Sequence, residues 1–419
     1  MGADKLVVVG QGYVGLPIAM RAVDAGFDVV GLETNAARVD MLSSGRSFVE
    51  DISDPQVRAA LKTGRYVATS EASAMQDFDF VIITVPTPLK AAVPDLSFIT
   101  DAAAVIGPHL SRGATVVLES TTYPGTTEEL LVPALESSSA MKAGVDFFVG
   151  YSPERIDPGN ATYNFVNTPK VFAGINDSST NRLRALYERL VDNVVEVSGP
   201  KEAELTKLLE NTFRHVNIAL VNELSMFAHA LDIDIWETIE AASTKPFGFM
   251  RFTPGPGVGG HCLPVDPTYL SWQVRQQLGR NFRFVELAND VNDHMPEYVI
   301  QRIMHGLNER SEAIRGSVVL VVGLSYKKNS GDMRQSPAIE VVNLLNAVGA
   351  DVQAVDNFVD PGGVPEFVRL VEFTPEVVAD ADAVVILTDH DDLDYGVIVD
   401  APGYVFDARH RLSGVRESL

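Results

Sequence analysis

The chain has 419 residues, a formal net charge of −23 and a single cysteine, Cys262. This length is enough for two or three domains. The charge opposes binding to nucleic acid or to an anionic membrane, so neither is expected as a partner. One cysteine excludes an intrachain disulfide and suits a reducing compartment, which favours a cytoplasmic location. No stretch approaches the ~20 apolar residues of a membrane span, and we expect no signal peptide and no metal site.

The N-terminal segment has the pattern of a βαβ unit. Residues 6–9 are a continuous apolar run, as in a strand that is buried on both faces. The glycine-rich turn 10–15 (GQGYVG) follows directly, and residues 16–25 are expected to form a helix. A second strand is expected over 27–32, and Glu33 comes immediately after it. The order strand, glycine turn, helix, strand and acid is typical of a dinucleotide-binding domain.

Each element of this pattern has a physical role in binding a dinucleotide. Gly10 permits the tight turn, Gly12 lets the backbone approach a pyrophosphate, and Gly15 lets helix and strand pack closely. The pyrophosphate would lie at the helix N-terminus. Glu33 can accept a hydrogen bond from a ribose 2′-OH and would repel a 2′-phosphate, so NAD is favoured over NADP. The alternative is a doubly wound domain that binds no nucleotide.

Polar residues follow further strands in this half of the chain. Strands are expected over residues 80–85, 115–119 and 147–151. Thr87, Thr121 and Glu154 come after these strands, where open α/β sheets bind their ligands. Each residue alone could equally cap a turn, but their common position favours a functional site.

The middle of the chain is expected to be helical from 202 to 242, because apolar residues recur there at helical spacing. Lys207 and Asn211 are four residues apart and share one face. Glu204 and Arg214 lie near that face, so it is either a solvated polar stripe or part of a site. So long and apolar a helix is also a candidate dimer interface.

A second α/β unit is expected late in the chain. Its strands are expected at 317–323, 351–356, 383–387 and 404–407, with a helix at 339–348. The loop 323–334 has Lys327 and Arg334, whose charges could bind a nucleotide without a glycine cradle. The predicted fold is therefore α/β, with two Rossmann-like doubly wound domains joined by a long central helix. The predicted boundaries are 1–196 for the NAD-binding domain, 197–300 for the central helical region with the cysteine, and 301–419 for the second domain.

Cys262 lies in the glycine-rich segment 255–267 (GPGVGGHCLPVDP). A free cysteine is often a small buried hydrophobe, but glycines that let a ligand approach favour a nucleophile. Pro264 and Asp266 suggest the first turn of a helix, whose N-terminus would stabilise the thiolate. His261 is expected to shape the pocket rather than to act as a base.

Seven segments occur in one order along the chain: GQGYVG, VPTP, ESTTYPGTTEE, SPER, ELTKLLEN, GPGVGGHCLPVDP and SYKKNSGDMRQSP. In this order they resemble the nucleotide-sugar 6-dehydrogenases, the UDP-glucose/UDP-mannuronic acid dehydrogenase family, over essentially the whole chain. The GGHC segment is most similar to the branch that acts on UDP-N-acetylhexosamines. UDP-glucose and dTDP-glucose stay open as substrates. A two-electron NAD dehydrogenase and a non-catalytic nucleotide-sugar binder are the remaining alternatives.

The resemblance implies oxidation of sugar carbon 6 from alcohol to carboxylate with two NAD, through a Cys262 thiohemiacetal and thioester. It implies that Lys207 stabilises an oxyanion or takes the alcohol proton. Asn211, Asp266 and Thr121 would position substrate or a water, and Glu154 would assist thioester hydrolysis. Which of Lys207, Asp266 and Glu154 is the base in each step stays open.

The resemblance also implies two binding sets. The cofactor set is Gly10, Gln11, Gly12, Tyr13, Val14, Gly15, Glu33, Arg38, Thr87, Thr121 and Arg334. The substrate set is Glu154, Arg155, Lys207, Asn211, Arg251, Phe252, Gly259, Gly260 and Lys327. The chain departs from the family in having Glu33 where Asp is more common and Gly331 in the cationic loop, where it would add flexibility. His390 stands where a tryptophan usually follows a Thr-acid pair, so that turn is expected to pack differently.

Overall fold

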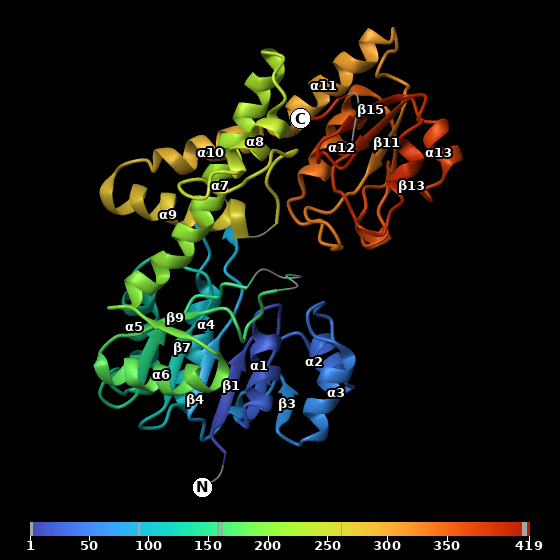
Figure 1. The fold of residues 1–419 in the computed structure, drawn as a ribbon. Coiled ribbons are helices and arrows are strands. Elements are labelled where there is room, and N and C mark those ends of the chain that lie inside the picture. The colour runs from blue at the N-terminus through green and yellow to red at the C-terminus, as the bar shows by residue number, and fades with distance from the viewer. Residues whose placement is uncertain (1–2, 91–92, 157–159, 161, 261, 413–416) are drawn as a thin grey trace. The chain divides into compact units, whose positions relative to one another are not determined.

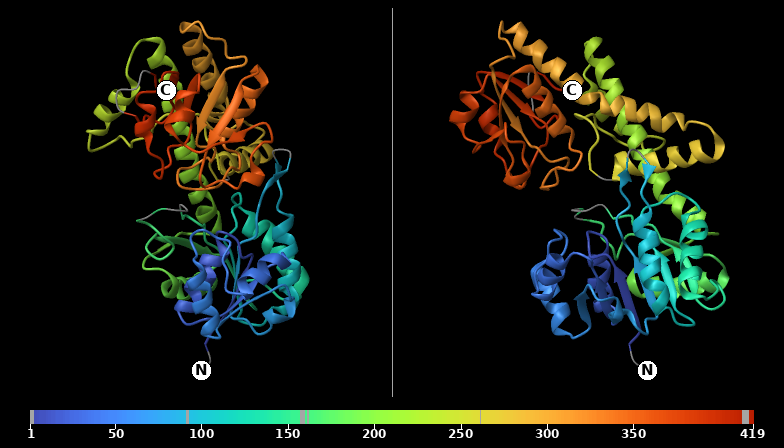
Figure 2. Two further views of the ribbon diagram at one scale, coloured as in Figure 1. Left: turned by 90° about the vertical axis from the view of Figure 1, so that its right-hand side faces the viewer. Right: turned by 180° about the vertical axis from the view of Figure 1, so that it is seen from behind.

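The computed structural model describes the chain except residues 1–2, 91–92, 157–159, 161, 261 and 413–416, and except the side chain of Cys262. It contains two compact units, residues 1–210 and 211–419. Helix α7 (Pro200–Ala230) belongs to both, because the boundary falls between Glu210 and Asn211 (Figures 1 and 2). Each unit is built on its own sheet, mostly parallel in unit 1 and parallel in unit 2.

The sheet of unit 1 has eight strands. They are β1 Lys5–Val9, β2 Asp28–Leu32, β3 Tyr66–Thr69, β4 Phe80–Ile83, β7 Thr115–Leu118, β8 Phe148–Tyr151, β9 Lys170–Gly174 and β10 Val194–Glu196. Their order is β10-β9-β8-β7-β4-β1-β2-β3, and the reversal of strand order around β1 is that of a doubly wound sheet. All pairs are parallel except β8 with β9. A short antiparallel pair, β5 Leu89–Lys90 and β6 Val93–Pro94, stands apart from this sheet.

Both faces of this sheet are covered by helices. The helices are α1 Gly15–Asp24, α2 Ala36–Ser43, α3 Asp54–Lys62, α4 Ser97–Ile106, α5 Val132–Ser139 and α6 Asp177–Leu190. Leu6 and Val8 of β1 pack into a core with α1, α3 and α6. Val7 and Val9 face a second core with α4 and α5. Successive strand residues point to opposite faces, so the apolar run 6–9 predicted this double coverage.

Unit 2 has a helical part and a five-stranded parallel sheet. The helical part comprises the second half of α7, α8 Ile235–Ser243, α9 Cys262–Leu278, α10 Arg283–Asp293 and α11 Met295–Glu309. The sheet consists of β11 Val318–Val322, β12 Asp351–Val355, β13 Arg369–Leu370, β14 Ala383–Ile386 and β15 Tyr404–Asp407. Its strand order is β13-β12-β11-β14-β15. Helices α12 (Pro337–Val348) and α11 share one core with β11, and α13 (Pro375–Ala379) shares the core of the opposite face.

The expected single helix over 202–242 is wrong. Helix α7 ends at Ala230 and α8 begins at Ile235. Asp232 has φ of 57°, a left-handed conformation that cannot continue a helix. The Asp234 side chain then caps α8 by accepting the N–H groups of Trp236 and Glu237. The apolar pattern runs through this break because both helices bury one face.

Among the described residues, none of the helices combines the length and the apolar character needed to cross a lipid bilayer.

Candidate active site

The glycine turn of unit 1 leaves room for a ligand where the pattern requires it. A Cβ on Gly15 would lie 1.9 Å from the carbonyl oxygen of Gly10, and Gly10 has φ of 92°. These two positions therefore need glycine for the turn and for packing. A Cβ on Gly12 would meet no atom within 4 Å, so its backbone faces open space. Helix α1 begins at Gly15 without a side-chain cap, which suits a pyrophosphate at its N-terminus.

Glu33 lies beside this turn and is held there by the backbone. Its Oε2 accepts the N–H of Gln11 at 3.2 Å, and its Oε1 accepts the N–H of Asn35 at 2.9 Å. The guanidinium of Arg38 is 3.7 Å from Oε2. The carboxylate is therefore fixed next to the glycine turn, as a partner for a ribose hydroxyl requires. The residues of this cradle fit NAD, which would bind at Gly12 and Glu33.

Other members of the predicted cofactor set differ in exposure. The Gln11 side chain is fully buried, donates to the carbonyl oxygen of Val8 and accepts from the Tyr66 hydroxyl at 2.8 Å. The Gln11 side chain therefore links β1 to β3. Tyr13 is 46% exposed, whereas Thr87 is buried.

A buried ion cluster supports Glu154. The Lys170 ammonium lies 2.6 Å from Oε2 of Glu119 and 3.3 Å from Oε2 of Glu154. The Tyr187 hydroxyl donates to Oε1 of Glu119 at 2.5 Å. Burial opposes the charge of Lys170, but the two carboxylates outweigh it and raise the pKa of Lys170 above its ordinary value. Oε1 of Glu154 also accepts the N–H groups of Arg155 and Ile156, both at 2.7 Å, so this carboxylate is held by three donors.

The first turns of α7 anchor a second group of polar contacts. The buried carboxylate of Glu204 accepts the N–H groups of Gly125 and Thr127 and the Thr127 hydroxyl. Lys207 is 9% exposed and donates to the Thr121 hydroxyl at 2.5 Å. A solvated stripe is therefore the wrong interpretation for Glu204 and Lys207, whereas Arg214 is exposed, as that interpretation expected.

Arg155 ties the loop after β8 to α7. Its guanidinium forms an ion pair with Glu210 at 2.6 Å and donates to the carbonyl oxygen of Pro169 at 2.6 Å. These contacts give Arg155 a structural role beside Glu154.

In unit 2, Asn211 and Asp266 meet. Nδ2 of Asn211 donates to Oδ2 of Asp266 at 2.6 Å, and the Asp266 side chain is 1% exposed. Helix α9 begins at Cys262, as Pro264 and Asp266 indicated, and continues through Pro267. His261 and the Cys262 side chain lie outside the described residues. Lys207 and Asn211 are one turn apart on α7, and each contacts a different predicted site residue.

The glycines before Cys262 are required by packing within unit 2. A Cβ on Gly259 would lie 2.7 Å from the carbonyl oxygen of Gln335, and a Cβ on Gly260 would lie 2.7 Å from the Tyr326 ring. Gly260 also has φ of 82°. Glycine at these two positions therefore has a steric explanation within unit 2, in addition to the predicted approach of a ligand.

Two further predicted substrate residues lie in the segment before these glycines. Arg251 pairs with Glu240 at 2.5 Å on the surface. The Phe252 ring packs edge-on against Phe213, with ring centroids 5.8 Å apart.

The cationic loop between β11 and α12 has contacts of its own. Lys327 is half-buried, and Arg334 pairs with Asp332 at 2.6 Å. A Cβ on Gly331 would lie 2.3 Å from the carbonyl oxygen of Phe358, so packing gives a reason for glycine at this position. Gly331 lets two loops pack together.

Lys170, Tyr187 and Asp356 are not among the residues predicted from the sequence, and His390 was expected only to change the packing of its turn. A signal existed for Lys170, because a lysine opens the otherwise apolar run 170–174. A buried lysine is rarely found without a carboxylate partner.

Three family models match the chain in succession. They are the NAD binding, central and UDP binding domains of the UDP-glucose/GDP-mannose dehydrogenase family, at residues 4–191, 201–294 and 320–413. The UDP-N-acetyl-D-mannosamine dehydrogenase of Pyrococcus horikoshii is 34% identical over 92% of this chain and 89% of its own. The UDP-N-acetyl-D-glucosamine 6-dehydrogenase of Salmonella typhi is 35% identical over 92% of this chain and 90% of its own.

Solved structures agree with these matches. The P. horikoshii UDP-D-ManNAc dehydrogenase has a TM-score of 0.89 at 31% identity and covers 99% of this chain and 98% of its own. A UDP-glucose dehydrogenase from Pyrobaculum islandicum has a TM-score of 0.87 at 29% identity, with coverage of 99% and 96%. The fold, the nucleotide cradle and these likenesses define an NAD-dependent oxidoreductase that acts on nucleotide sugars. The chain belongs to the UDP-glucose/GDP-mannose dehydrogenase family.

Proposed function

We propose that this dehydrogenase oxidises carbon 6 of a UDP-N-acetylhexosamine to the carboxylate, through a thioester on Cys262. The substrate class follows the relatives named for UDP-N-acetyl-D-mannosamine and UDP-N-acetyl-D-glucosamine. UDP-glucose is the second candidate, because the P. islandicum structure is a UDP-glucose dehydrogenase. We also propose three domains, with the boundaries 1–196, 197–300 and 301–419. The three family models support this division, because they match residues 4–191, 201–294 and 320–413.

The proposed chemistry proceeds in three steps. When bound at the Gly12 and Glu33 cradle, NAD would supply the hydride acceptor for each of the two oxidations. In the first, the alcohol loses a proton and a hydride and becomes an aldehyde. The Cys262 thiolate adds to the aldehyde carbon and, after protonation, gives a thiohemiacetal, which loses a second proton and hydride to become a thioester. Water then adds, the carbon–sulfur bond breaks, and the carboxylate leaves while two protons are released and the thiolate is restored. A thioester hydrolyses more readily than the ester that serine would form.

The observation that carries this proposal is the pair of contacts made by one helix. Helix α7 presents Lys207, bonded to Thr121, and one turn later Asn211, bonded to Asp266. Lys207 is suited to stabilise the alkoxide or the tetrahedral oxyanion. Asp266, held by an amide donor, is suited to accept a proton or orient water.

Glu154 has a different role in the proposed chemistry. Three donors hold its carboxylate, so it is better suited to orient water through its charge than to exchange protons. Lys207 and Asp266 then remain the candidates for the base.

The test is the number of NADH molecules formed per sugar consumed. UDP-N-acetylglucosamine, UDP-N-acetylmannosamine, UDP-glucose and dTDP-glucose are compared at equal concentration. Two NADH per sugar supports the four-electron reaction, whereas one indicates a two-electron dehydrogenase and none a binding protein. Cys262→Ser, which keeps an oxygen nucleophile, should stop carboxylate release, and Cys262→Ala, which has no nucleophilic atom, should stop it as well. Carboxylate release by Cys262→Ser at the parent rate would refute the thioester.

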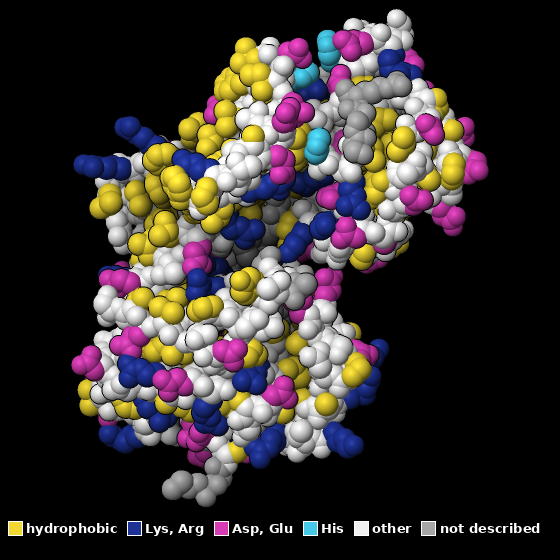
Figure 3. All heavy atoms as spheres, in the orientation of Figure 1, with side chains coloured by type: hydrophobic (Ala, Val, Ile, Leu, Met, Phe, Trp, Pro, Cys, Tyr) yellow, Lys and Arg dark blue, Asp and Glu magenta, His cyan; other side chains and the backbone are white. Residues whose placement is uncertain are grey.

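A homodimer through the central helices is part of the proposal. Apolar side chains gather on the surface of α7 to α10 in unit 2 (Figure 3). Those between 40% and 70% exposed include Leu220, Leu224, Phe227, Leu278, Phe284 and Leu287. Large exposed apolar patches mark protein interfaces. Light scattering should give twice the chain mass for the parent protein and a monomer for Leu224→Glu with Phe227→Glu; a monomeric parent would refute the dimer. A cytoplasmic location is proposed from the single cysteine.

A further inference from the structure

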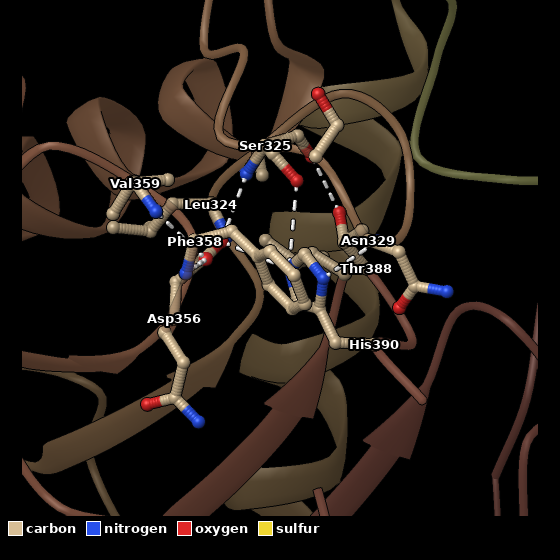
Figure 4. A network of polar contacts seen from close by, with 12 residues as sticks. Leu324, Ser325, Asn329, Asp356, Phe358, Val359, Thr388 and His390 are labelled. Carbon is tan, nitrogen blue, oxygen red and sulfur yellow. Dashed lines mark hydrogen bonds and ion pairs between the residues drawn. The ribbon is translucent and has the colours of Figure 1, made fainter. Parts of the chain in front are cut away.

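Three neighbouring strands of unit 2 end in one polar cluster (Figure 4). Strand β11 lies between β12 and β14, and all three run parallel. The cationic loop 323–334 follows β11, Asp356 follows β12, and His390 lies in the turn after β14. The His390 side chain is fully buried between the other two segments. This cluster lies outside the predicted catalytic set.

The contacts of His390 indicate which ring nitrogen donates and which accepts. Its Nδ1 accepts the backbone N–H of Asn329 at 2.9 Å. Its Nε2 lies 2.9 Å from Oδ2 of Asp356 and 3.4 Å from the hydroxyl of Ser325. That hydroxyl donates to the carbonyl oxygen of Lys327 at 2.8 Å, so it can only accept from the ring. These contacts are all satisfied by the tautomer that has its proton on Nε2 and a lone pair on Nδ1.

Asp356 supplies the fixed charge of the cluster. Burial opposes that charge, but hydrogen bonds from His390 and from the N–H groups of Leu324 and Phe358 lower the pKa of Asp356 below its ordinary value. The Phe358 ring stacks on His390 with centroids 4.9 Å apart. An anion on one side and an N–H donor on the other thus determine how the imidazole lies.

The same turn holds the loop at two more points. The Thr388 hydroxyl donates to the carbonyl oxygen of Ser325 at 2.6 Å. The Asn329 amide exchanges two hydrogen bonds with Asp391, at 2.7 and 2.9 Å. Residues 325 and 329 are thereby fixed on both sides of Lys327, and Lys327 itself contributes a carbonyl acceptor. The contacts of His390 with Ser325 and Asn329 therefore help to fix the position of Lys327 between them.

We propose that His390 is a positioning residue that holds the Lys327 loop in the shape that binds the nucleotide sugar, and that it does so only while its ring is neutral. A second proton on Nδ1 would face the N–H of Asn329, donor against donor, and the bond that fixes Asn329 would be lost. The inference rests on the proposed role of the 323–334 loop in nucleotide binding. It predicts that substrate affinity falls with acid pH although the substrate itself does not titrate.

Other charged side chains lie near the His390 ring. Asp389, Asp391 and Asp392 belong to its own turn, and Lys328 and Arg411 pair with Asp391 at 3.2 and 3.7 Å. Among the contacts of the described residues, only Asp356 bonds the ring through a charged group. The lysine and the arginine are exposed or partly exposed, so solvent and salt screen their effect.

The experiment measures binding of UDP-N-acetylglucosamine to the full-length protein by calorimetry, from about pH 8 to about pH 5.5, where histidine ordinarily titrates. Both phosphates of this ligand are esterified, so its own charge stays constant. His390→Asn keeps an acceptor for the Asn329 N–H but cannot titrate, whereas His390→Phe keeps the ring and loses both polar contacts. His305→Asn is the matched control, because that exposed histidine contacts only Glu309 among the ion pairs of the described residues. Lys327→Ala tests the loop itself.

The parent protein and His305→Asn should lose about tenfold in affinity across this range, the factor that corresponds to one lost hydrogen bond. His390→Asn should bind within a few-fold of the parent at the upper pH and should lose the acid dependence. His390→Phe should bind about tenfold more weakly throughout, with kcat changed less than KM. If His390→Asn keeps the parent's acid dependence, the positioning role is wrong. If Lys327→Ala binds as tightly as the parent, the proposed nucleotide role of the loop fails instead.

Discussion

Replacing Lys170 by methionine tests the buried ion cluster that supports Glu154. The Lys170 side chain is 5% exposed, and its partners Glu119 and Glu154 are 0% and 8% exposed. Methionine is a linear side chain of similar length, so the substitution fills the same space and removes the cation between the two carboxylates. Those carboxylates are then buried without their shared partner.

The expected cost follows from this burial. Removing one member of a buried ion pair typically destabilises a protein by about 3–5 kcal/mol, because the remaining charge stays desolvated. A second substitution, Glu119→Met, removes the carboxylate that lies closer to Lys170. The double variant should therefore recover a large part of the loss, although the Tyr187 hydroxyl then loses its acceptor.

The assay is urea unfolding with and without NAD. Circular dichroism follows both units, whereas the two tryptophans, Trp236 and Trp272, both lie in unit 2 and report on that unit by fluorescence. The transition of unit 1 is the one that NAD moves to higher urea, because a ligand stabilises the unit that binds it. Lys170→Met should lower the midpoint of that transition. Lys142→Met is the matched control, since Lys142 pairs with Glu136 on the surface of the same unit and is 69% exposed.

Two results would refute this reasoning. The first is a Lys170→Met midpoint that equals that of the parent and of Lys142→Met. The second is a double variant, Glu119→Met with Lys170→Met, that is less stable than Lys170→Met alone. Either outcome would mean that the ion pairs of Lys170 do not stabilise unit 1.

Four further predictions concern the site. Burial raises the pKa of Glu204 from 4.5 to about 7, so unit 1 should lose about 3 kcal/mol of stability as pH rises from about 4.5 to about 7; urea midpoints should show this slope in the parent and not in Glu204→Gln. Gly15→Ala should abolish NAD binding in a titration, because its Cβ would overlap the Gly10 carbonyl. Glu33→Ser should raise the NADP-to-NAD ratio of kcat/KM about tenfold by removing the repulsion of a 2′-phosphate; an unchanged ratio would contradict its role. Asp266→Asn should lower kcat about a hundredfold in the NADH assay while the circular dichroism spectrum is retained.

Much of the secondary structure of unit 1 was predictable, because the sequence signals for its strands, turns and helix ends lie in neighbouring residues. An apolar run buried on both faces, a glycine turn and a helix stop are each decided by neighbouring residues. The strands from 6–9 to 147–151 therefore formed close to their expected positions. The break between α7 and α8 was missed because Asp232 and Asp234 interrupt an apolar periodicity that continues on both sides.

The composition and motifs of this chain by themselves determined two α/β domains, NAD as cofactor and the family. The motifs also indicated Lys207, Asn211 and Asp266 as site residues, because each of them occupies a position that has a functional role in the family pattern. Only the tertiary structure decided that Lys170 lies between Glu119 and Glu154, and that His390 faces Asn329. These partners are between 16 and 61 residues apart in sequence. The charge state of a buried side chain depends on which distant strand end folding places against it, and no local pattern of residues contains that information.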